Sequence, residues 1–360
     1  MIHKDDAKGT LTRDAAALAI YYHGKEIPGW LPISHMVDLA ARLLGADVHK
    51  TGEIGSTRGG AWRGYLRNAA RGGTQSALFI ARNPAEVRAF LELPDFRTPK
   101  RLRALWIIDS FRTEDLLSAR LMSQFDVVAY CQAYDSACYT ALVRDRALLL
   151  PWGTDALGLG SAAATRPYDV MRLGRQPVAW DNDDHTHRLC AARNLTFHGR
   201  PPYIAFVEMQ RSLVQDWYGK AKFIIAHSNL AAPAPYTHKT KEYITARWTD
   251  ALAAGVVVAG VQPRRDLDLL NWPEATLDFA EVDLEHNLDQ LQDAAADWTP
   301  KVALRNHLGA LERLDWRWRF KALCDRLDIS APALEADLSA LRARCDDLRA
   351  QLGNAALNRG

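Results

Sequence analysis

The chain has 360 residues, of which 48% are apolar and 24% are charged, and its formal net charge is +2 at pH 7. This composition is typical of a soluble globular protein, and so small a net charge gives no field that would attract nucleic acid. A chain of this length is long for one hydrophobic core and predicts two domains.

Neither membrane spans nor disulfides are expected. No stretch approaches the roughly 20 apolar residues of a membrane-spanning helix, and the first residues lack the apolar core of a signal peptide. The five cysteines are scattered and odd in number, so we interpret them as reduced and structural. We therefore expect a cytoplasmic protein, with peripheral contact at the inner membrane face as its closest approach to lipid.

Residues 1–157 show the alternation of a Rossmann-like domain. Apolar runs predict strands at residues 16–22, 77–81, 104–108, 127–131 and 147–150. Helical patterns lie between them, at residues 33–44, from the Asn83 cap onward and at residues 113–122. Strands that alternate with helices favour a parallel sheet with crossover helices.

Two features of this half bear on ligands. The Gly/Arg-rich stretch at residues 52–73 carries four arginines that would suit an anionic or lipid-linked acceptor, or would simply form a solvated surface: Arg58, Arg63, Arg67 and Arg71. Three tryptophans stand beside loops, where they would either face a cleft or anchor the loops on the core: Trp30, Trp152 and Trp272.

The second half repeats the alternation after a Gly/Ser/Ala-rich stretch at residues 158–167, which we interpret as a flexible linker. Residues 168–300 contain apolar runs at 168–173, 195–198, 223–226 and 256–261, with helical patterns at 185–193, 205–217 and 244–254. Two such regions predict an α/β protein with two Rossmann-like domains facing a cleft, an arrangement that suits a two-substrate enzyme.

The tail from Val302 onward is helical, and residues 329–360 are expected to form an amphipathic helix. Its apolar residues recur at spacings of four and three: Leu334, Leu338, Leu341, Cys345, Leu348 and Leu352. Such a short seam either packs on its own protein or forms a homodimer contact through Leu334 to Leu352.

The stretch from Glu242 to Gly260 carries the most information. Glu242 lies in a loop and Asp250 lies on the following helix, which ends at Gly255 before an apolar strand. Ligands of parallel sheets bind beyond the carboxyl ends of the strands, where helix amino termini expose free N–H groups. The pair therefore predicts a ligand site. The structural alternative is that Asp250 is a helix cap or forms an ion pair with Arg247 on the same helix.

The run Arg247-Trp-Thr-Asp250-Ala-Leu-Ala-Ala-Gly255-Val-Val-Val resembles the donor-sugar block of GT-B glycosyltransferases, particularly the bacterial spore-maturation-like group related to retaining family 4. Segments 150–155, 169–175 and 195–199 resemble further motifs of that family in the same order. Residues 301–328 resemble the helix that returns to the first domain, so the likeness covers about residues 100–328.

The resemblance implies roles for individual residues. Asp250 would bind the donor's ribose and Glu242 would lie beside its sugar, although an aspartate here replaces the family's second glutamate. Arg175 would bind the diphosphate, with Lys239 or Lys241 in place of a lysine that the family carries soon after that arginine. We group Thr245, Arg247 and Gly199 with these donor-binding residues.

In the first domain, Asp109 and His23 each follow a predicted strand and would point into the cleft. Either would orient or deprotonate an acceptor hydroxyl. Alternatively, Asp109 caps the next helix or pairs with Arg112, and His23 is structural. Asp181-Asn182-Asp183 resembles the metal-binding Asp-x-Asp of GT-A enzymes, or it is a solvated turn and cap; we expect no metal or other cofactor.

The resemblance therefore implies transfer of a sugar, with retention of configuration, from a nucleoside-diphosphate donor to a glycan, lipid-linked or small-molecule acceptor hydroxyl. Two alternatives stay open at this point. One is a sugar-nucleotide epimerase or hydrolase on the same fold, and the other is a non-catalytic scaffold that binds a partner through its C-terminal helix.

Overall fold

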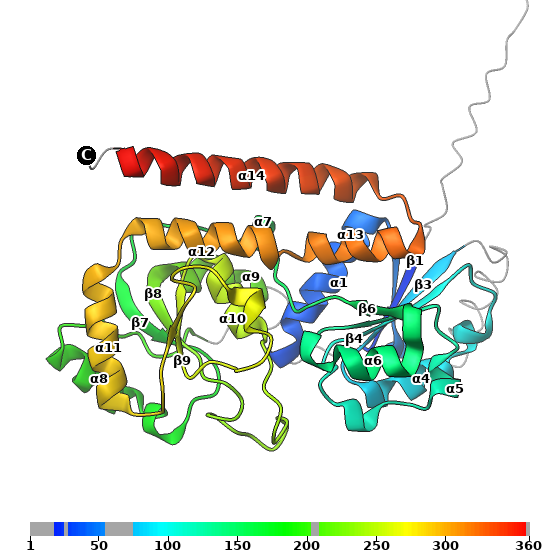
Figure 1. Cartoon of the computed structure of the whole chain (residues 1–360), viewed down its shortest axis with the longest axis horizontal. Coiled ribbons are helices and arrows are strands. Elements are labelled where there is room, and N and C mark those ends of the chain that lie inside the picture. The colour runs from blue at the N-terminus through cyan, green and yellow to red at the C-terminus, as the bar shows by residue number, and fades with distance from the viewer. Residues whose placement is uncertain (1–17, 25–27, 55–74, 203–208, 358–360) are drawn as a thin grey trace, which may run out of the picture.

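The computed structural model describes residues 18–24, 28–54, 75–202 and 209–357, and Figure 1 shows two α/β domains side by side with long helices across both. Arg58, Arg63, Arg67 and Arg71 lie outside the described residues. In the part of the chain that is described, no helix is both long enough and apolar enough to span a membrane.

The first domain contains a six-stranded parallel sheet in the order β2-β1-β3-β4-β5-β6. Its strands are β1 (Leu18–Tyr22), β2 (Asp47–Lys50), β3 (Ser76–Ala81), β4 (Arg103–Ile107), β5 (Val127–Tyr130) and β6 (Ala147–Leu149). Five of these were predicted. The edge strand β2 was missed because three of its four residues are polar and all four are only half-buried, so it shows no apolar run.

The second domain contains a four-stranded parallel sheet in the order β10-β9-β8-β7. Its strands are β7 (Tyr168–Arg172), β8 (Ala221–Ile225), β9 (Val257–Gly260) and β10 (Thr276–Asp278). The strand predicted at residues 195–198 is reduced to an isolated bridge between Phe197 and Val170, with backbone hydrogen bonds that join Thr196 and His198 to β7. Left-handed backbone at Asn194 and Gly199 bounds this bridge and limits its length.

The helices of the first domain are α1 (Leu31–Leu44), α2 (Thr51–Ile54), α4 (Val87–Leu91), α5 (Ala119–Met122) and α6 (Ser136–Val143). Asn83 caps its helical segment as predicted, accepting a hydrogen bond from the backbone N–H of Ala85. The predicted helix at residues 113–122 was wrong: a 3-10 turn and the short α5 flank an extended Leu116. Leu116 and Leu117 pack against the core instead.

The remaining helices are α7 (Ala156–Leu159), α8 (Asp183–Ala192), α9 (Met209–Ser212), α10 (Ala246–Ala253), α11 (Leu284–Asp297), α12 (Pro300–Arg313), α13 (Trp316–Leu327) and α14 (Pro332–Leu357). The prediction at residues 205–217 falls partly outside the described residues, and its described part is α9 followed by a π-helical turn. The prediction of a single returning helix at residues 301–328 was wrong, because the chain forms two separate helices there, α12 and α13.

The break between α12 and α13 is where the two connections between the domains meet. The backbone of Thr154 accepts a hydrogen bond from Trp316 N–H and donates one to Leu314 O. The Asp315 carboxylate accepts from the N–H of Leu157 at 2.9 Å. The expected linker at residues 158–167 is also held by contacts, since buried Arg166 donates to two carbonyls of the second domain.

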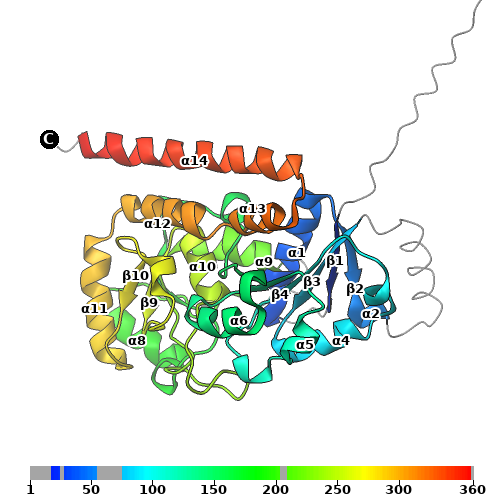
Figure 2. The same cartoon turned by 45° about the vertical axis from the view of Figure 1, so that its right-hand side comes forward.

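The C-terminal helix α14 lies along both domains, as the two views in Figures 1 and 2 show. Leu334 and Leu338 pack in the hydrophobic core of the first domain. Leu341, Cys345 and Leu348 pack in the hydrophobic core of the second domain. All five are at most 3% exposed. The seam therefore packs on its own protein, which leaves those side chains no free face for a homodimer.

This packing predicts that Leu341→Ala lowers the free energy of unfolding by about 3 kcal/mol, since it opens a cavity in a buried core. Urea unfolding measures the loss, and Ser339→Ala on the exposed face of α14 is the control. If the seam were a subunit contact instead, the loss would depend on protein concentration and sedimentation would show dissociation.

Candidate donor and acceptor sites

Two arginines, Arg175 and Arg247, lie together at the carboxyl edge of the second sheet. Arg247 Nη1 donates to the carbonyl oxygen of Arg175 at 3.3 Å, and its Nη2 donates to that of His227 at 3.1 Å. Within the described ranges, neither guanidinium forms an ion pair with a carboxylate, and Arg175 Nε is buried without a hydrogen-bond partner. Two neighbouring arginines without acidic partners have the charge and the hydrogen-bond donors that an anion would need, which makes them a candidate anion site.

The electrostatics of Arg247 agree with this assignment. Burial, together with the neighbouring Arg175 charge, lowers the pKa of its guanidinium to about 10. A bound anion would relieve both effects, because it supplies the negative charge that the protein omits.

The amino terminus of α10 begins at the same edge. Thr245 is its N-terminal capping residue, with extended backbone, and its hydroxyl is buried without a partner in the described part of the chain. At the other end, Gly255 has φ +73, and a Cβ there would lie 2.8 Å from the Ala303 carbonyl oxygen. Glycine therefore permits the tight turn that returns the chain into β9.

Asp250 lies deeper on α10 and is 3% exposed. Its two carboxylate oxygens accept hydrogen bonds from Thr154 Oγ1 and Gln210 Nε2, each at 2.7 Å. Burial raises its pKa to about 6. Asp250 thus links α10 to the connection between the domains at Thr154. The alternative of an ion pair with Arg247 does not occur among the described contacts.

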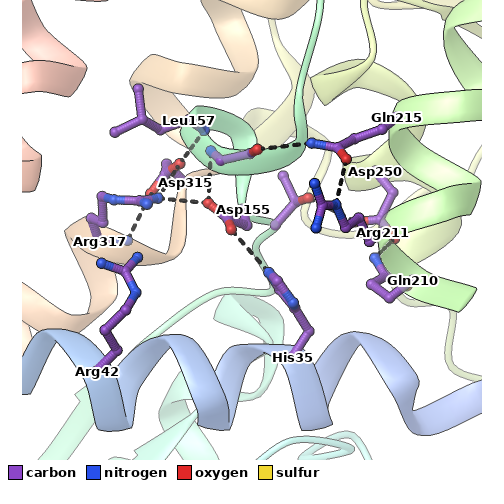
Figure 3. Close-up of polar contacts among 12 residues, drawn as sticks. His35, Arg42, Asp155, Leu157, Gln210, Arg211, Gln215, Asp250, Asp315 and Arg317 are labelled. Atoms are coloured by element: carbon purple, nitrogen blue, oxygen red, sulfur yellow. Dashed lines mark hydrogen bonds and ion pairs between the residues drawn. The ribbon is translucent and has the colours of Figure 1, made fainter. Parts of the chain in front are cut away.

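Figure 3 shows that this link adjoins a buried ionic cluster around Asp155. The Asp155 carboxylate contacts His35 Nε2 at 2.9 Å and Arg317 Nη1 at 2.8 Å. Despite its burial, these partners lower its pKa to about 2. Arg317 also forms ion pairs with Asp315, which precedes α13, and with Asp337 on α14. Sequence analysis missed this cluster, because its members lie up to 302 positions apart, from His35 to Asp337, and meet only where α13 and α14 return to α1.

The other acidic and basic donor candidates occupy the loop before α10. Glu242 is half-buried and accepts a hydrogen bond from the N–H of Arg264 at 2.7 Å, so it joins two loops of the second domain. Lys239 is exposed. Lys241 extends to the first domain, where its ammonium donates to Phe111 O, Thr113 Oγ1 and Asp135 Oδ1.

The acceptor candidates lie at the carboxyl edge of the first sheet. Asp109 follows β4, and burial raises the pKa of its carboxyl to about 7, against the opposing charge of Arg112. That ionisation lies close to physiological pH, as suits a general base. His23 follows β1, which has neighbours β2 and β3 on its two sides, and it lines a small cavity of about 20 Å³ with Trp30 and Arg82.

Tyr243 connects the two sets of candidates, and sequence analysis missed it. Its ring stacks on Phe111 of the first domain with centroids 3.9 Å apart. Burial raises its pKa to about 12; the Asp109 charge adds to that rise, and the Arg175 and Arg247 charges oppose it. Tyr243 therefore contacts the first domain through Phe111 and is close enough to Asp109, Arg175 and Arg247 to feel their charges. Its place beside Glu242 was the only signal for it in the sequence.

Two further expectations, the Asp181-Asn182-Asp183 segment and Gly199, concern the edge near β7. Asp181 and Asp183 form ion pairs with Arg172, at 2.9 and 2.5 Å, and Asn182 caps α8 by accepting from His185 N–H. These contacts match the turn-and-cap alternative to a metal site. Gly199 lies against Asp183 with φ +36, where a Cβ would be 3.0 Å from the carboxylate.

The tryptophans mostly anchor structure. Trp152 is buried in the first core near Trp316, and Trp272 Nε1 donates to Asn306 Oδ1 at 2.9 Å. Trp30 remains partly exposed beside His23, with the Arg82 guanidinium 5.9 Å from its ring centroid.

Comparison with known proteins places this geometry in a fold class. No protein-family model matches the chain, and no curated protein matches it significantly. HepE from Anabaena, solved in complex with UDP and glucose, superposes with a TM-score of 0.55 at 8% identity, covering 87% of this chain and 99% of HepE. A glycosyltransferase from Rickettsia africae ESF-5 superposes with a TM-score of 0.52 at 10% identity, covering 87% and 98%.

The chain therefore has the GT-B fold of these two structures, with α14 as a C-terminal helical extension, as the sequence predicted. At identities this low, the similarity establishes the fold. The activity has to be argued from the residues of the site.

Proposed function

We propose that this protein transfers a sugar from a nucleoside-diphosphate donor to an acceptor hydroxyl. The observation that carries the proposal is the pair Arg175 and Arg247 beside the α10 amino terminus. The Arg247 guanidinium donates to the backbone oxygen of Arg175, and neither arginine has an acidic partner in the described ranges. Similarity to a fold that binds UDP and glucose in HepE supports the same assignment.

The proposed chemistry uses charge stabilisation on one side of the cleft. When the bond between sugar and diphosphate breaks, negative charge grows on the leaving diphosphate. Arg175, Arg247 and the free N–H groups at the start of α10 would stabilise that charge from fixed positions, without rearrangement during the reaction. We propose that Glu242 and Asp250 complete the donor side, facing the sugar and the ribose; both carboxylates would exchange a present protein contact for a donor hydroxyl.

On the other side, we propose that the acceptor hydroxyl binds at the carboxyl edge of the first sheet. Asp109, with its pKa raised to about 7, would accept the hydroxyl proton or orient the group, and His23 would line the acceptor pocket. Retention of configuration is the expectation from the sequence resemblance, and the anomeric proton coupling of the product, measured by NMR, would decide it.

The proposal predicts that a nucleoside diphosphate stabilises the protein and that its parent nucleoside does not. A ligand at 100 times its Kd adds about 2.7 kcal/mol to the free energy of unfolding. Thermal unfolding with UDP, GDP and dTDP, and with uridine, guanosine and thymidine as controls, measures this difference. If none of the diphosphates or their sugars raises the Tm, the protein has no donor site and the proposal is wrong.

The same ligands separate the alternatives. A hydrolase or epimerase would consume the nucleotide-sugar at a rate that acceptor extracts leave unchanged, whereas a transferase needs the acceptor. A non-catalytic scaffold would keep its biological activity when Arg175 and Arg247 are both replaced.

A further inference from the structure

The loop formed by residues 233–243 contacts the arginine pair on one side. Arg175 Nη1 donates to the Tyr236 hydroxyl at 3.1 Å, and the Arg175 guanidinium carbon lies 5.5 Å from the centre of the Tyr236 ring. The Tyr236 side chain is 67% exposed, so little apolar packing accounts for its position. The ring and the hydroxyl of Tyr236 both contact the Arg175 guanidinium, so together they restrict its position and its orientation.

The same loop contacts the first domain on its other side. The Lys241 ammonium donates to Phe111 O at 2.8 Å, to Thr113 Oγ1 at 2.7 Å and to Asp135 Oδ1 at 3.0 Å. Arg112 Nη2 donates to the backbone oxygen of Tyr236 itself at 3.3 Å. These bonds cross from one domain to the other and involve a buried acid, since Asp135 is 8% exposed.

Internal bonds make the loop behave as one unit. The Thr237 hydroxyl donates to Ala234 O at 2.9 Å, and the Thr237 N–H also donates to that oxygen at 3.0 Å. Asn229 Nδ2 donates to the backbone oxygens of His238 and Lys241, at 2.9 Å each. A shift of Lys241 relative to the first domain would therefore reach Tyr236.

We propose that Tyr236 is a positioning residue, which holds Arg175 for the donor diphosphate and makes that position depend on docking of the 233–243 loop against the first domain. The inference rests on the proposed function, because it assigns the diphosphate to Arg175. Tyr236 acts through the guanidinium and does not itself contact the phosphate. Donor binding and contact between the domains are then coupled through one side chain.

The test begins with Tyr236→Phe, which removes only the hydroxyl. Loss of one hydrogen bond of about 1 kcal/mol corresponds to about fivefold weaker binding. Calorimetry is expected to show that loss for UDP and for inorganic pyrophosphate, with no change for uridine, which has no phosphate to meet Arg175. In an Arg175→Gln background, Tyr236→Phe is expected to have no further effect.

Tyr134→Phe is the matched control. Tyr134 is a second exposed tyrosine, 60% exposed, and it also carries an arginine over its ring, Arg265 at 3.5 Å. Its contacts in the described part of the chain are with Arg265 and Asp266 and not with Arg175, so its replacement is expected to leave UDP and pyrophosphate binding unchanged.

Asp135→Asn tests the connection to the first domain by the sign of its effect. If docking of the loop positions Arg175, weakening the Lys241 contact lowers the UDP affinity by about two- to threefold. If Lys241 were a phosphate ligand held back by Asp135, the same change would free its charge and raise the affinity. A rise, or no change, contradicts the docking part of the proposal.

The outcomes separate this inference from the proposed function. If Tyr236→Phe binds UDP and pyrophosphate as tightly as the unaltered protein does, the inference is wrong and the proposed function stands. The same holds if Tyr236→Phe still weakens binding about fivefold in the Arg175→Gln background, because the hydroxyl would then not act through Arg175. If pyrophosphate binds and no nucleotide does, the proposed function is wrong. The effect of Tyr236→Phe on pyrophosphate affinity then decides whether Tyr236 positions Arg175. If neither binds, both are wrong.

Discussion

Replacing Arg247 by methionine is expected to weaken UDP binding by about 100-fold. Each hydrogen bond from a charged donor contributes about 1.5–3 kcal/mol, and 2.8 kcal/mol corresponds to 100-fold in Kd. Arg247 is held by two backbone carbonyls that fix its direction, so a flexible neighbour cannot replace it. Calorimetry with UDP, or with whichever diphosphate stabilises the protein, measures the loss.

The same substitution is expected to change the free energy of unfolding by less than about 1 kcal/mol. The substitution removes two hydrogen bonds to carbonyls, at about 1 kcal/mol each. It also removes the cost of burying the Arg247 charge beside Arg175, the cost that lowers the Arg247 pKa to about 10. The two effects oppose each other. Binding lost without stability lost is the pattern of a functional charge. Arg188→Met, an exposed arginine on α8, is the control, and unaltered UDP binding by Arg247→Met would refute the donor site.

The central elements of the fold were predictable because their residues are buried on both faces. Strands β1, β3, β4, β8 and β9 read as apolar runs, and each is almost wholly buried. The edge strands β2 and β10 have one free side and polar residues, so their sequences lack that signal. The break at Asp315 was also hidden, because its cause is a bridge to Thr154, more than 150 positions away.

The site was predictable only in part, for a similar reason. Arg175 and Arg247 were found because they lie in local motifs next to strand and helix ends. The partners that decide how the candidates behave are distant: Asp250 meets Thr154 and Gln210, 96 and 40 positions away, and Lys241 meets Asp135, 106 positions away. No local pattern shows that a loop lysine crosses to the other domain.

Replacing Asp109 by asparagine is expected to make the protein more stable and about 100-fold less active. The pKa of Asp109 is raised from 3.8 to about 7 by burial, so the folded state binds more protons than the unfolded chain between those pH values. The free energy of unfolding therefore falls as the pH rises from about 4 to about 7 and is level above that range. Asparagine has no charge to bury, so it removes this loss.

The gain should consequently be near zero at pH 4 and complete above pH 7. Three pKa units at about 1.4 kcal/mol each set an upper limit of about 4 kcal/mol, and since Asp109 retains some contact with solvent, we expect about 2 kcal/mol. Urea unfolding at both pH values measures it. Asp115→Asn is the control, because that carboxylate is 39% exposed and pairs only loosely with Arg112.

The activity of Asp109→Asn tests whether the carboxylate acts as a base. If the Asp109 carboxylate takes the acceptor proton, kcat/KM rises with pH to a plateau above about pH 7, and Asp109→Asn loses both the rate and that limb of the profile, since a positioned base contributes about 10²-fold or more. A variant that is more stable and fully active would make Asp109 a buried acid without a catalytic role. A variant that is inactive but no more stable at pH 8 than at pH 4 would mean that its carboxyl carries no buried charge, and the loss of rate would then reflect lost acceptor contacts.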